Sequence, residues 1–284
     1  MRRNLLAGAF SFVLSLAAGA ATQTSSAELQ GMVENPCPAP LAEPDAVRRF
    51  NEAFLRPGPV DLPHLIGLTR DPSYVAYDAE KKARAARDWA GLCIYREANR
   101  KLVRSGERPS IVFLGDSITE NWVRADPAFF SDGRVGRGVG GQTSGQMLAR
   151  FRADVVALRP RIVHIMAGTN DVAGNGGPTS PQAFQDNIKS MVEIARANEI
   201  KVVLASIPPA DRFLWAPGLK PAGRIVELNV WLRDYASREE LGFVDYHTLL
   251  ADQGGGLPRE FGIDGVHPNQ AGYAAMRDLA VGVR

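Results

Sequence analysis

After Pro109 the sequence alternates short apolar runs with amphipathic stretches, and only a few folds fit this alternation. Strands are predicted for the apolar runs at residues 110–114, 135–139, 161–167, 201–207 and 243–246. Helices are predicted between or after them at residues 144–157, 181–198, 222–238 and 268–281. Because runs that are apolar throughout are buried on both faces, the pattern predicts a flavodoxin-like, three-layer α/β/α sandwich around a mostly parallel five-stranded sheet.

Residues 28–108 show a different pattern, which is helical, interrupted by proline-rich turns and without a convincing strand. Its clearest element is a continuous helix predicted over residues 78–105. There Trp89, Leu92 and Leu102 recur at helical spacing, and Gly106 supplies a stop. The sequence therefore predicts an N-terminal helical extension, residues 28–108, followed by an α/β domain, residues 109–284.

The first residues have the pattern of an export signal. Arg2 and Arg3 precede an apolar, small-residue run from Leu5 to Ala21. This run is shorter than the roughly 20 residues that a membrane-spanning helix needs. We therefore expect a signal peptide at residues 1–21, with cleavage as late as residue 27, a secreted or periplasmic location, and no stable membrane anchor after cleavage.

The chain contains two cysteines, Cys37 and Cys93, and both lie after the predicted signal. An oxidising compartment favours joining an even number of thiols. We expect a disulfide between them, with two unpaired core thiols as the alternative.

The charge of the mature chain argues against a nucleic-acid partner. Two of the 33 Lys and Arg residues are Arg2 and Arg3, so removal of the signal leaves 31 basic against 31 acidic residues. A net charge near zero gives no electrostatic attraction for nucleic acid or an anionic membrane surface. The sequence also lacks a metal-ligand pattern such as His-Glu-x-x-His, and we expect neither a metal nor a cofactor.

Four short blocks carry polar side chains at or near predicted strand ends, where ligands bind in parallel sheets. They are Gly-Asp-Ser-Ile-Thr at 115–119, Gly-Val-Gly-Gly-Gln-Thr at 138–143, Gly-Thr-Asn-Asp at 168–171 and Asp-Gly-Val-His-Pro at 264–268. Each block alone is ordinarily a helix cap or a turn. Together they supply a nucleophile, a base with a carboxylate, and hydrogen-bond donors at one edge of one sheet.

His267 is the histidine best suited to act as a base. Asp264 lies three residues earlier in a glycine-containing loop, so its carboxylate can reach Nδ1 and leave Nε2 free to accept a proton. Pro268 is predicted as the first helical residue. The other histidines have other expected places: His64 in the extension, His164 in the core of a strand, and His247 at a strand end.

In order and spacing the four blocks resemble those of the SGNH or GDSL hydrolases, in particular the branch similar to platelet-activating-factor acetylhydrolase catalytic subunits. The resemblance implies that Ser117 is the nucleophile, with Asp264 and His267 completing a triad. It also implies oxyanion donors from the backbone of Ser117 and Gly141 and from the side chain of Asn170. The family often has Asp where this chain has Gln142, a departure next to Gly141 that makes Gly140 the alternative to Gly141 as the donor.

The resemblance implies a serine ester hydrolase that works through an acyl-enzyme, without metal, on small-molecule or carbohydrate esters, and the predicted signal peptide implies that it is secreted. Short acyl or acetyl groups are expected. An O-acyltransferase with the same triad and a catalytically inactive glycan-binding module are the alternatives. Trp122, Phe213 and Trp215 are candidates for lining the substrate site. The natural substrate, the role of the extension and the oligomeric state stay open.

Overall fold

The computed structural model of the chain describes residues 32–58, 61–262 and 264–282. The chain divides into two compact units, residues 1–37 and residues 38–284. The predicted signal peptide lies outside the described residues, and residues 32–37 of the first unit contain neither helix nor strand. The helices, the strands and the candidate site described below all belong to the second unit.

The second unit contains one five-stranded sheet in which every neighbouring pair is parallel. The strands are β1 (Ile111–Gly115), β2 (Arg134–Gly138), β3 (Ile162–Met166), β4 (Lys201–Ala205) and β5 (Gly242–Val244). Their order is β2-β1-β3-β4-β5, which is the flavodoxin-like order. The predicted fold class is therefore confirmed.

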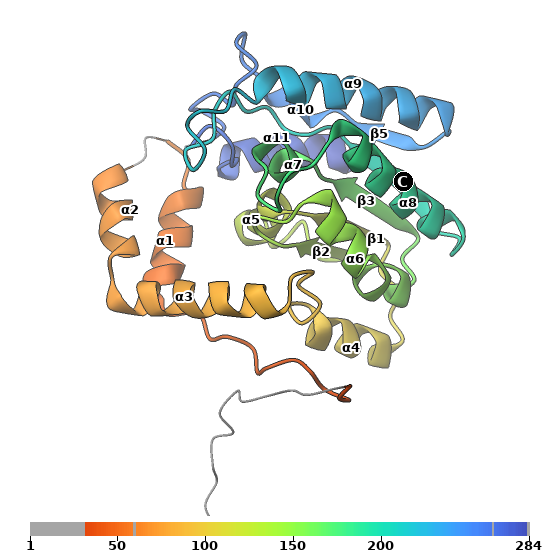
Figure 1. Cartoon of the computed structure of the whole chain (residues 1–284), viewed down its shortest axis with the longest axis horizontal. Coiled ribbons are helices and arrows are strands. Elements are labelled where there is room, and N and C mark those ends of the chain that lie inside the picture. Colours follow the sequence, from red (N-terminus) through yellow and green to blue (C-terminus); the bar gives the residue numbers. More distant parts are fainter. Residues whose placement is uncertain (1–31, 59–60, 263, 283–284) are drawn as a thin grey trace, which may run out of the picture. The chain divides into compact units, whose positions relative to one another are not determined.

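Helices cover both faces of this sheet (Figure 1). One face packs against α6 (Ser144–Asp154), α8 (Pro181–Arg196) and α9 (Ala222–Arg238); the other packs against α5 (Ser117–Ala125), α10 (Tyr246–Leu250) and α11 (Gln270–Ala280). Two short helical segments, η1 (Val156–Leu158) and α7 (Thr169–Ala173), precede and follow β3 in the chain. Within β1, Val112 and Leu114 face the first layer and Phe113 faces the second, as the strand period of two requires.

The predicted end of the last strand and the predicted start of the last helix both differ from the structure, because a side chain caps a helix at each place. The last strand was predicted to reach residue 246, but Asp245 accepts a hydrogen bond from the Thr248 amide and begins α10 instead. Similarly, Pro268 is not the first residue of the last helix, because Asn269 accepts a hydrogen bond from the Gly272 amide and caps α11.

An aromatic cluster fills the layer between the sheet and α5. Trp122 is fully buried there and stacks on Phe129 and Tyr273, at ring-centroid distances of 5.2 and 5.9 Å. Phe113 meets Trp122 edge-on at 5.7 Å. Burying side chains of this size stabilises the fold by about 1.5–3 kcal/mol each. The expectation that Trp122 lines the substrate site is wrong, because its position on α5 points it into the core.

The extension folds into four helices, drawn in orange to yellow in Figure 1. They are α1 (Asp45–Leu55), α2 (Leu62–Thr69), α3 (Pro72–Arg87) and α4 (Arg96–Ser105). Leu55 at the end of α1 is buried in the hydrophobic cluster of the α5 face. The extension therefore shares a core with the sheet.

The continuous helix predicted over residues 78–105 is wrong, because residues 88–95 form a turn between α3 and α4. The Asp88 carboxylate accepts hydrogen bonds from the Leu92 and Cys93 amides, at 2.9 and 2.7 Å, and Gly91 has a φ of 71°. Trp89 and Leu92 are 58% and 46% exposed. The predicted stop at Gly106 is confirmed by its left-handed conformation.

Both cysteines are disulfide-bonded and neither is free, which confirms the predicted disulfide. Within the described residues, no helix has the length and apolar character needed to cross a membrane.

Candidate active site

The candidate site lies where the strand order reverses. The connections from β1 and β3 leave in opposite directions along the sheet, which opens a crevice beyond their carboxyl ends. Ser117 follows β1 and begins α5, while Asn170 follows β3 within α7. Asp116 caps α5 by accepting a hydrogen bond from the Ile118 amide at 2.9 Å. This cap fixes the turn that presents the Ser117 hydroxyl at the sheet edge.

The structure brings Ser117, His267 and Asp264 into one hydrogen-bonded line. Ser117 Oγ lies 2.9 Å from His267 Nε2, and His267 Nδ1 lies 2.7 Å from Asp264 Oδ2. The side chains of His267 and Asp264 are only 15% and 16% exposed. With Nδ1–H donated to the carboxylate, Nε2 is left as an acceptor for the serine proton.

The loop that carries His267 is organised by the same carboxylate. Asp264 Oδ1 accepts the backbone N–H groups of Val266 and His267, at 3.0 and 2.8 Å. Gly265, which lies between Asp264 and Val266, has a φ of 82°, a left-handed conformation that suits glycine. One aspartate thus shapes the loop through Oδ1 and orients the imidazole through Oδ2.

The charges of the two groups stabilise each other. Burial opposes the charged imidazolium, but the hydrogen bond and charge of Asp264 outweigh it and raise the pKa of His267 above its ordinary value. Burial likewise opposes ionisation of Asp264, yet hydrogen bonds from His267 hold its pKa below the ordinary value. The pKa of Asp116 is different, because burial raises it to about 6.

Two backbone N–H groups in the blocks that follow β1 and β2, those of Ser117 and Gly141, have no acceptor among the described residues. The Ser117 N–H is one of the unpaired donors at the start of α5. The neighbouring Gly140 N–H, by contrast, donates to Glu120 Oε2 at 2.7 Å. Gly141, with a φ of 81°, is therefore the better placed of the two glycines to serve a ligand.

The Asn170 side chain is buried and held at both ends. Its Nδ2 donates to Asp116 Oδ2 and to the Gln142 carbonyl, both at 3.1 Å. Its Oδ1 accepts from Asn175 Nδ2 at 2.5 Å, and Asn175 Oδ1 in turn accepts the Trp215 indole N–H at 3.0 Å. Because an indole can only donate, this chain of bonds fixes the orientation of both amides and leaves Nδ2 of Asn170 directed toward Asp116, the residue before Ser117.

Two aromatic rings lie against His267. The Phe54 ring from α1 meets it edge-on, with centroids 5.6 Å apart, and the Trp215 ring lies 6.3 Å away. Trp215 is 45% exposed, so it can line the substrate site as expected, whereas Phe213 is fully buried beneath it and cannot.

The remaining histidines lie outside this arrangement. His164 is fully buried in β3, as predicted, and burial lowers its pKa to about 3. His247 follows the cap of α10, and His64 lies in α2. Over the part of the chain that the structure describes, no three His, Cys, Asp or Glu side chains are grouped closely enough to hold a metal ion.

The sequence missed three residues that contact the site, Phe54, Glu120 and Asn175. Asn175 stands between Gly174 and Gly176, five residues after Asn170, and this spacing was a usable signal. Glu120 lies one helical turn after Ser117, on the same face of α5. Phe54 had no such signal, because its contact with His267 spans more than 200 residues of sequence.

Comparisons with known proteins agree with this fold. The model of the GDSL-like lipase/acylhydrolase family matches residues 113–275. A GDSL-like lipase from Bacteroides thetaiotaomicron is 42% identical, over 68% of this chain and 96% of that one, with a TM-score of 0.64. A provisionally named acylhydrolase from Bacteroides fragilis is 43% identical, over 68% and 95%, with the same TM-score.

Two further matches are weaker, one because its sequence identity is lower and the other because the matched stretch is short. A Streptococcus pneumoniae protein provisionally named platelet activating factor is 25% identical over 71% of this chain and 97% of its own, with a TM-score of 0.57. The uncharacterized lipoprotein YqeF of Bacillus subtilis (strain 168) is 39% identical over 75 residues, 25% of this chain. That match spans 31% of YqeF, so the chain covers less than a third of this curated relative.

Proposed function

The chain belongs to the GDSL-like lipase/acylhydrolase family, and on this premise we propose that it is a serine ester hydrolase in which Ser117, His267 and Asp264 form the catalytic triad. The observation that carries the proposal is the line of hydrogen bonds from Ser117 Oγ through both nitrogens of His267 to Asp264, at 2.9 and 2.7 Å. A nucleophile, a base and a group that orients the base are hydrogen-bonded in the order that acyl transfer requires.

In the acylation half, Ser117 Oγ attacks the ester carbonyl carbon while His267 Nε2 takes the hydroxyl proton. The carbonyl oxygen becomes a tetrahedral oxyanion, and the imidazolium is stabilised by Asp264. The C–O bond to the alcohol then breaks, and the alcohol leaves with the proton from Nε2. The raised pKa of His267 supports this role, since the base must hold the proton while the intermediate exists.

In the deacylation half, a water molecule replaces the alcohol. His267 Nε2 takes a proton from the water as its oxygen attacks the acyl carbon. Collapse of the second tetrahedral intermediate returns the proton to Ser117 Oγ and releases the acid.

The oxyanion is proposed to accept hydrogen bonds from three donors: the backbone N–H groups of Ser117 and Gly141 and Nδ2 of Asn170. The two backbone groups have no competing acceptor among the described residues. Asn170 Nδ2 is engaged at 3.1 Å with Asp116 and Gln142, so the oxyanion would take the place of one of these longer contacts. Such an exchange favours the charged transition state over the neutral substrate.

We propose short acyl or acetyl esters, including esters of carbohydrates, as substrates. The support is the pair of bulky rings, Phe54 and Trp215, whose centroids lie 5.6 and 6.3 Å from that of the His267 ring. Aromatic faces of this kind also suit the apolar faces of sugar rings.

Export to the periplasm or the exterior is proposed after removal of residues 1–21, with residues 28–108 as an extension and 109–284 as the hydrolase domain. The N-terminal apolar run, the disulfide and the match to a protein named as a lipoprotein support it.

The test is steady-state hydrolysis of aryl esters graded from acetate to long acyl chains, with purified protein and its Ser117→Ala variant. Free acid should accumulate without an added alcohol, fastest for the short chains, and the variant should lose this activity while its circular dichroism is unchanged. Acid release by the folded Ser117→Ala protein would refute the serine mechanism. Acyl transfer to an added sugar without free acid would assign the chain as a transferase.

A further inference from the structure

The loop of residues 138–142, which contains Gly141, is tied to the extension at both of its ends. Tyr95 Oη donates to the Gly138 carbonyl at 2.5 Å, and Gln142 Nε2 donates to the Ala90 carbonyl at 2.8 Å. Both extension residues belong to the turn 88–95 that separates α3 from α4. One short segment thus holds the two ends of the loop that carries the proposed oxyanion donor.

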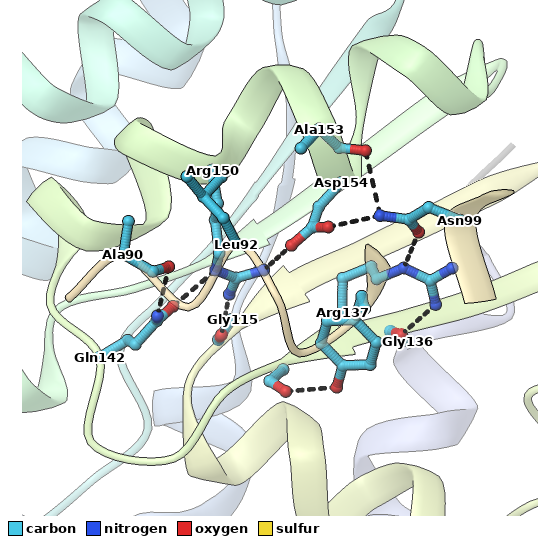
Figure 2. A network of polar contacts seen from close by, with 12 residues as sticks. Ala90, Leu92, Asn99, Gly115, Gly136, Arg137, Gln142, Arg150, Ala153 and Asp154 are labelled. Carbon is cyan, nitrogen blue, oxygen red and sulfur yellow. Dashed lines mark hydrogen bonds and ion pairs between the residues drawn. The ribbon is translucent and has the colours of Figure 1, made fainter. Parts of the chain in front are cut away.

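Gln142 is the central residue of these contacts. Its side chain is 3% exposed, and Figure 2 shows it between Ala90 and Arg150. While Nε2 donates to the extension, Oε1 accepts from Arg150 Nε at 2.5 Å. Its backbone carbonyl also accepts from Asn170 Nδ2. A single residue therefore contacts the extension, the buried arginine and the side chain of a second proposed oxyanion donor.

Arg150 extends the connection to the strand that precedes Ser117. Its fully buried guanidinium donates through Nη2 to the Gly115 carbonyl at 2.9 Å and through Nη1 to Asp154 at 2.8 Å. Asn99 of α4 donates to the same Asp154 at 2.6 Å and accepts from Arg137 in β2 at 2.8 Å (Figure 2). These buried polar groups are rigid because each has specific partners in a low-dielectric interior.

We propose that segment 88–99 of the extension positions the oxyanion site, and that Tyr95 and Gln142 are its positioning residues. The inference rests on the proposed function. The segment does not touch substrate; it sets where the Gly141 N–H and the Asn170 amide stand relative to Ser117 Oγ. The extension is therefore required for the rate of the chemical step, in addition to any contribution to stability.

The chemistry of the Gln142 contacts explains why an amide is needed there. The Ala90 carbonyl can only accept and the Arg150 guanidinium can only donate, so the side chain between them must present one donor and one acceptor. A carboxylate of the same shape would still accept the hydrogen bond from Arg150. It has no donor for the Ala90 carbonyl, so two acceptor oxygens would face and repel each other. Gln142→Glu therefore breaks the contact with the extension without changing the volume of the side chain.

The experiment compares the parent enzyme with Tyr95→Phe, Gln142→Glu and a control, Tyr74→Phe. Tyr95→Phe removes one hydroxyl and keeps the ring, which lies 4.8 Å from the Arg137 guanidinium. Tyr74 belongs to α3 of the same extension, and its hydroxyl has no hydrogen bond among the described residues. Four quantities are measured: kcat and KM for a short acyl ester, Tm, and the inhibition constant of a short alkylboronic acid, which forms a tetrahedral adduct with a nucleophilic serine.

We expect kcat to fall about tenfold for Tyr95→Phe and up to about 100-fold for Gln142→Glu. Deleting a whole oxyanion donor lowers kcat by about 10²–10³, and displacing a donor should cost less than deleting it. The inhibition constant should rise by a similar factor, while KM changes less than twofold. Tyr74→Phe should match the parent. The tetrahedral adduct is the sensitive probe, because a purely structural role would lower Tm without weakening it.

The inference is overturned if the parent is active but kcat and the inhibition constant of both variants equal those of Tyr74→Phe, whatever happens to Tm. A parent that neither hydrolyses esters nor binds the boronic acid would instead overturn the proposed function, and this inference with it.

Discussion

Replacing Asn170 by Ala separates the proposed electrostatic role of this residue from its structural one. The change removes one of three donors to the oxyanion, for which a loss of about 10²–10³ in kcat is the usual scale. KM should change far less, because the donor acts mainly on charge that develops in the transition state. The loss should be the same for every acyl chain length, since the oxyanion is common to all of them.

The structure also predicts a cost in stability. Asn170 is 3% exposed, and its removal leaves two buried acceptors, Asp116 Oδ2 and the Gln142 carbonyl, without the donor that each has at 3.1 Å. A buried polar group left unpaired costs about 1–3 kcal/mol. In a domain of this size each kcal/mol lowers Tm by roughly 2–4 °C. The variant should therefore remain folded at 25 °C.

The assay is kcat and KM at 25 °C for a short acyl ester, with Tm measured in parallel. Asn229→Ala is the matched control, because Asn229 is also buried and its side chain bonds only the two backbone groups of Ile207, at 2.7 and 2.9 Å, among the described residues. It should lose a similar amount of stability with less than a threefold change in kcat. A fall in kcat for Asn170→Ala no larger than that of the control would refute the oxyanion role.

Three further predictions concern the triad and the disulfide. The kcat/KM of the parent should fall as the pH drops through the pKa of His267, because the protonated imidazole cannot act as a base; the midpoint in a pH–rate profile should lie above the ordinary value of about 6.5. Asp264→Asn should lower kcat less than Ser117→Ala and move that midpoint to lower pH, because the group that raises the pKa has gone; an unchanged midpoint would contradict the assigned pair. Replacing Cys37 and Cys93 by Ala should lower the free energy of unfolding by about 4 kcal/mol in the chain-entropy model, measured by denaturant titration; equal midpoints and m-values would contradict it.

The sheet could be predicted from the sequence because its signal is local. The segment Ile111–Gly115 is apolar throughout and buried on both faces, so its composition alone identifies it as a central strand. Asp264 and His267 were also found locally, since three residues of loop are enough to bring a carboxylate to Nδ1. The pairing of His267 with Ser117 spans 150 residues and came from the resemblance of the four blocks to a family.

The errors arose where tertiary contacts decide the local structure. The turn at residues 88–95 interrupts a stretch with good helical spacing, because Asp88 captures two backbone amides and Gly91 adopts a positive φ. An Asp within a stretch of helical spacing can also be an exposed helix residue, so Asp88 does not by itself predict a turn. Trp122 is close to Ser117 in sequence, which suggests a place beside the substrate, but it is fully buried in the aromatic cluster under the sheet.

The contacts of the extension with the candidate site could not be read from the sequence. Phe54 reaches His267, and Gln142 reaches Ala90, through contacts between segments more than 50 residues apart. Gln142 was noticed as a departure from the family pattern, yet its partner lies in a part of the chain that the family model does not match. Only the folded arrangement brings the two together.

Trapping the acyl-enzyme tests the central claim, that Ser117 is the nucleophile, most directly. The parent enzyme and Ser117→Ala are mixed with an activated acetyl ester, quenched in acid within one turnover, digested and analysed by mass spectrometry. We predict an acetyl group on Ser117 in the parent, formed in step with the first burst of alcohol, and none on the matching peptide of the variant. An acetyl group on another residue, or alcohol release by the variant at the parent's rate, would contradict the mechanism.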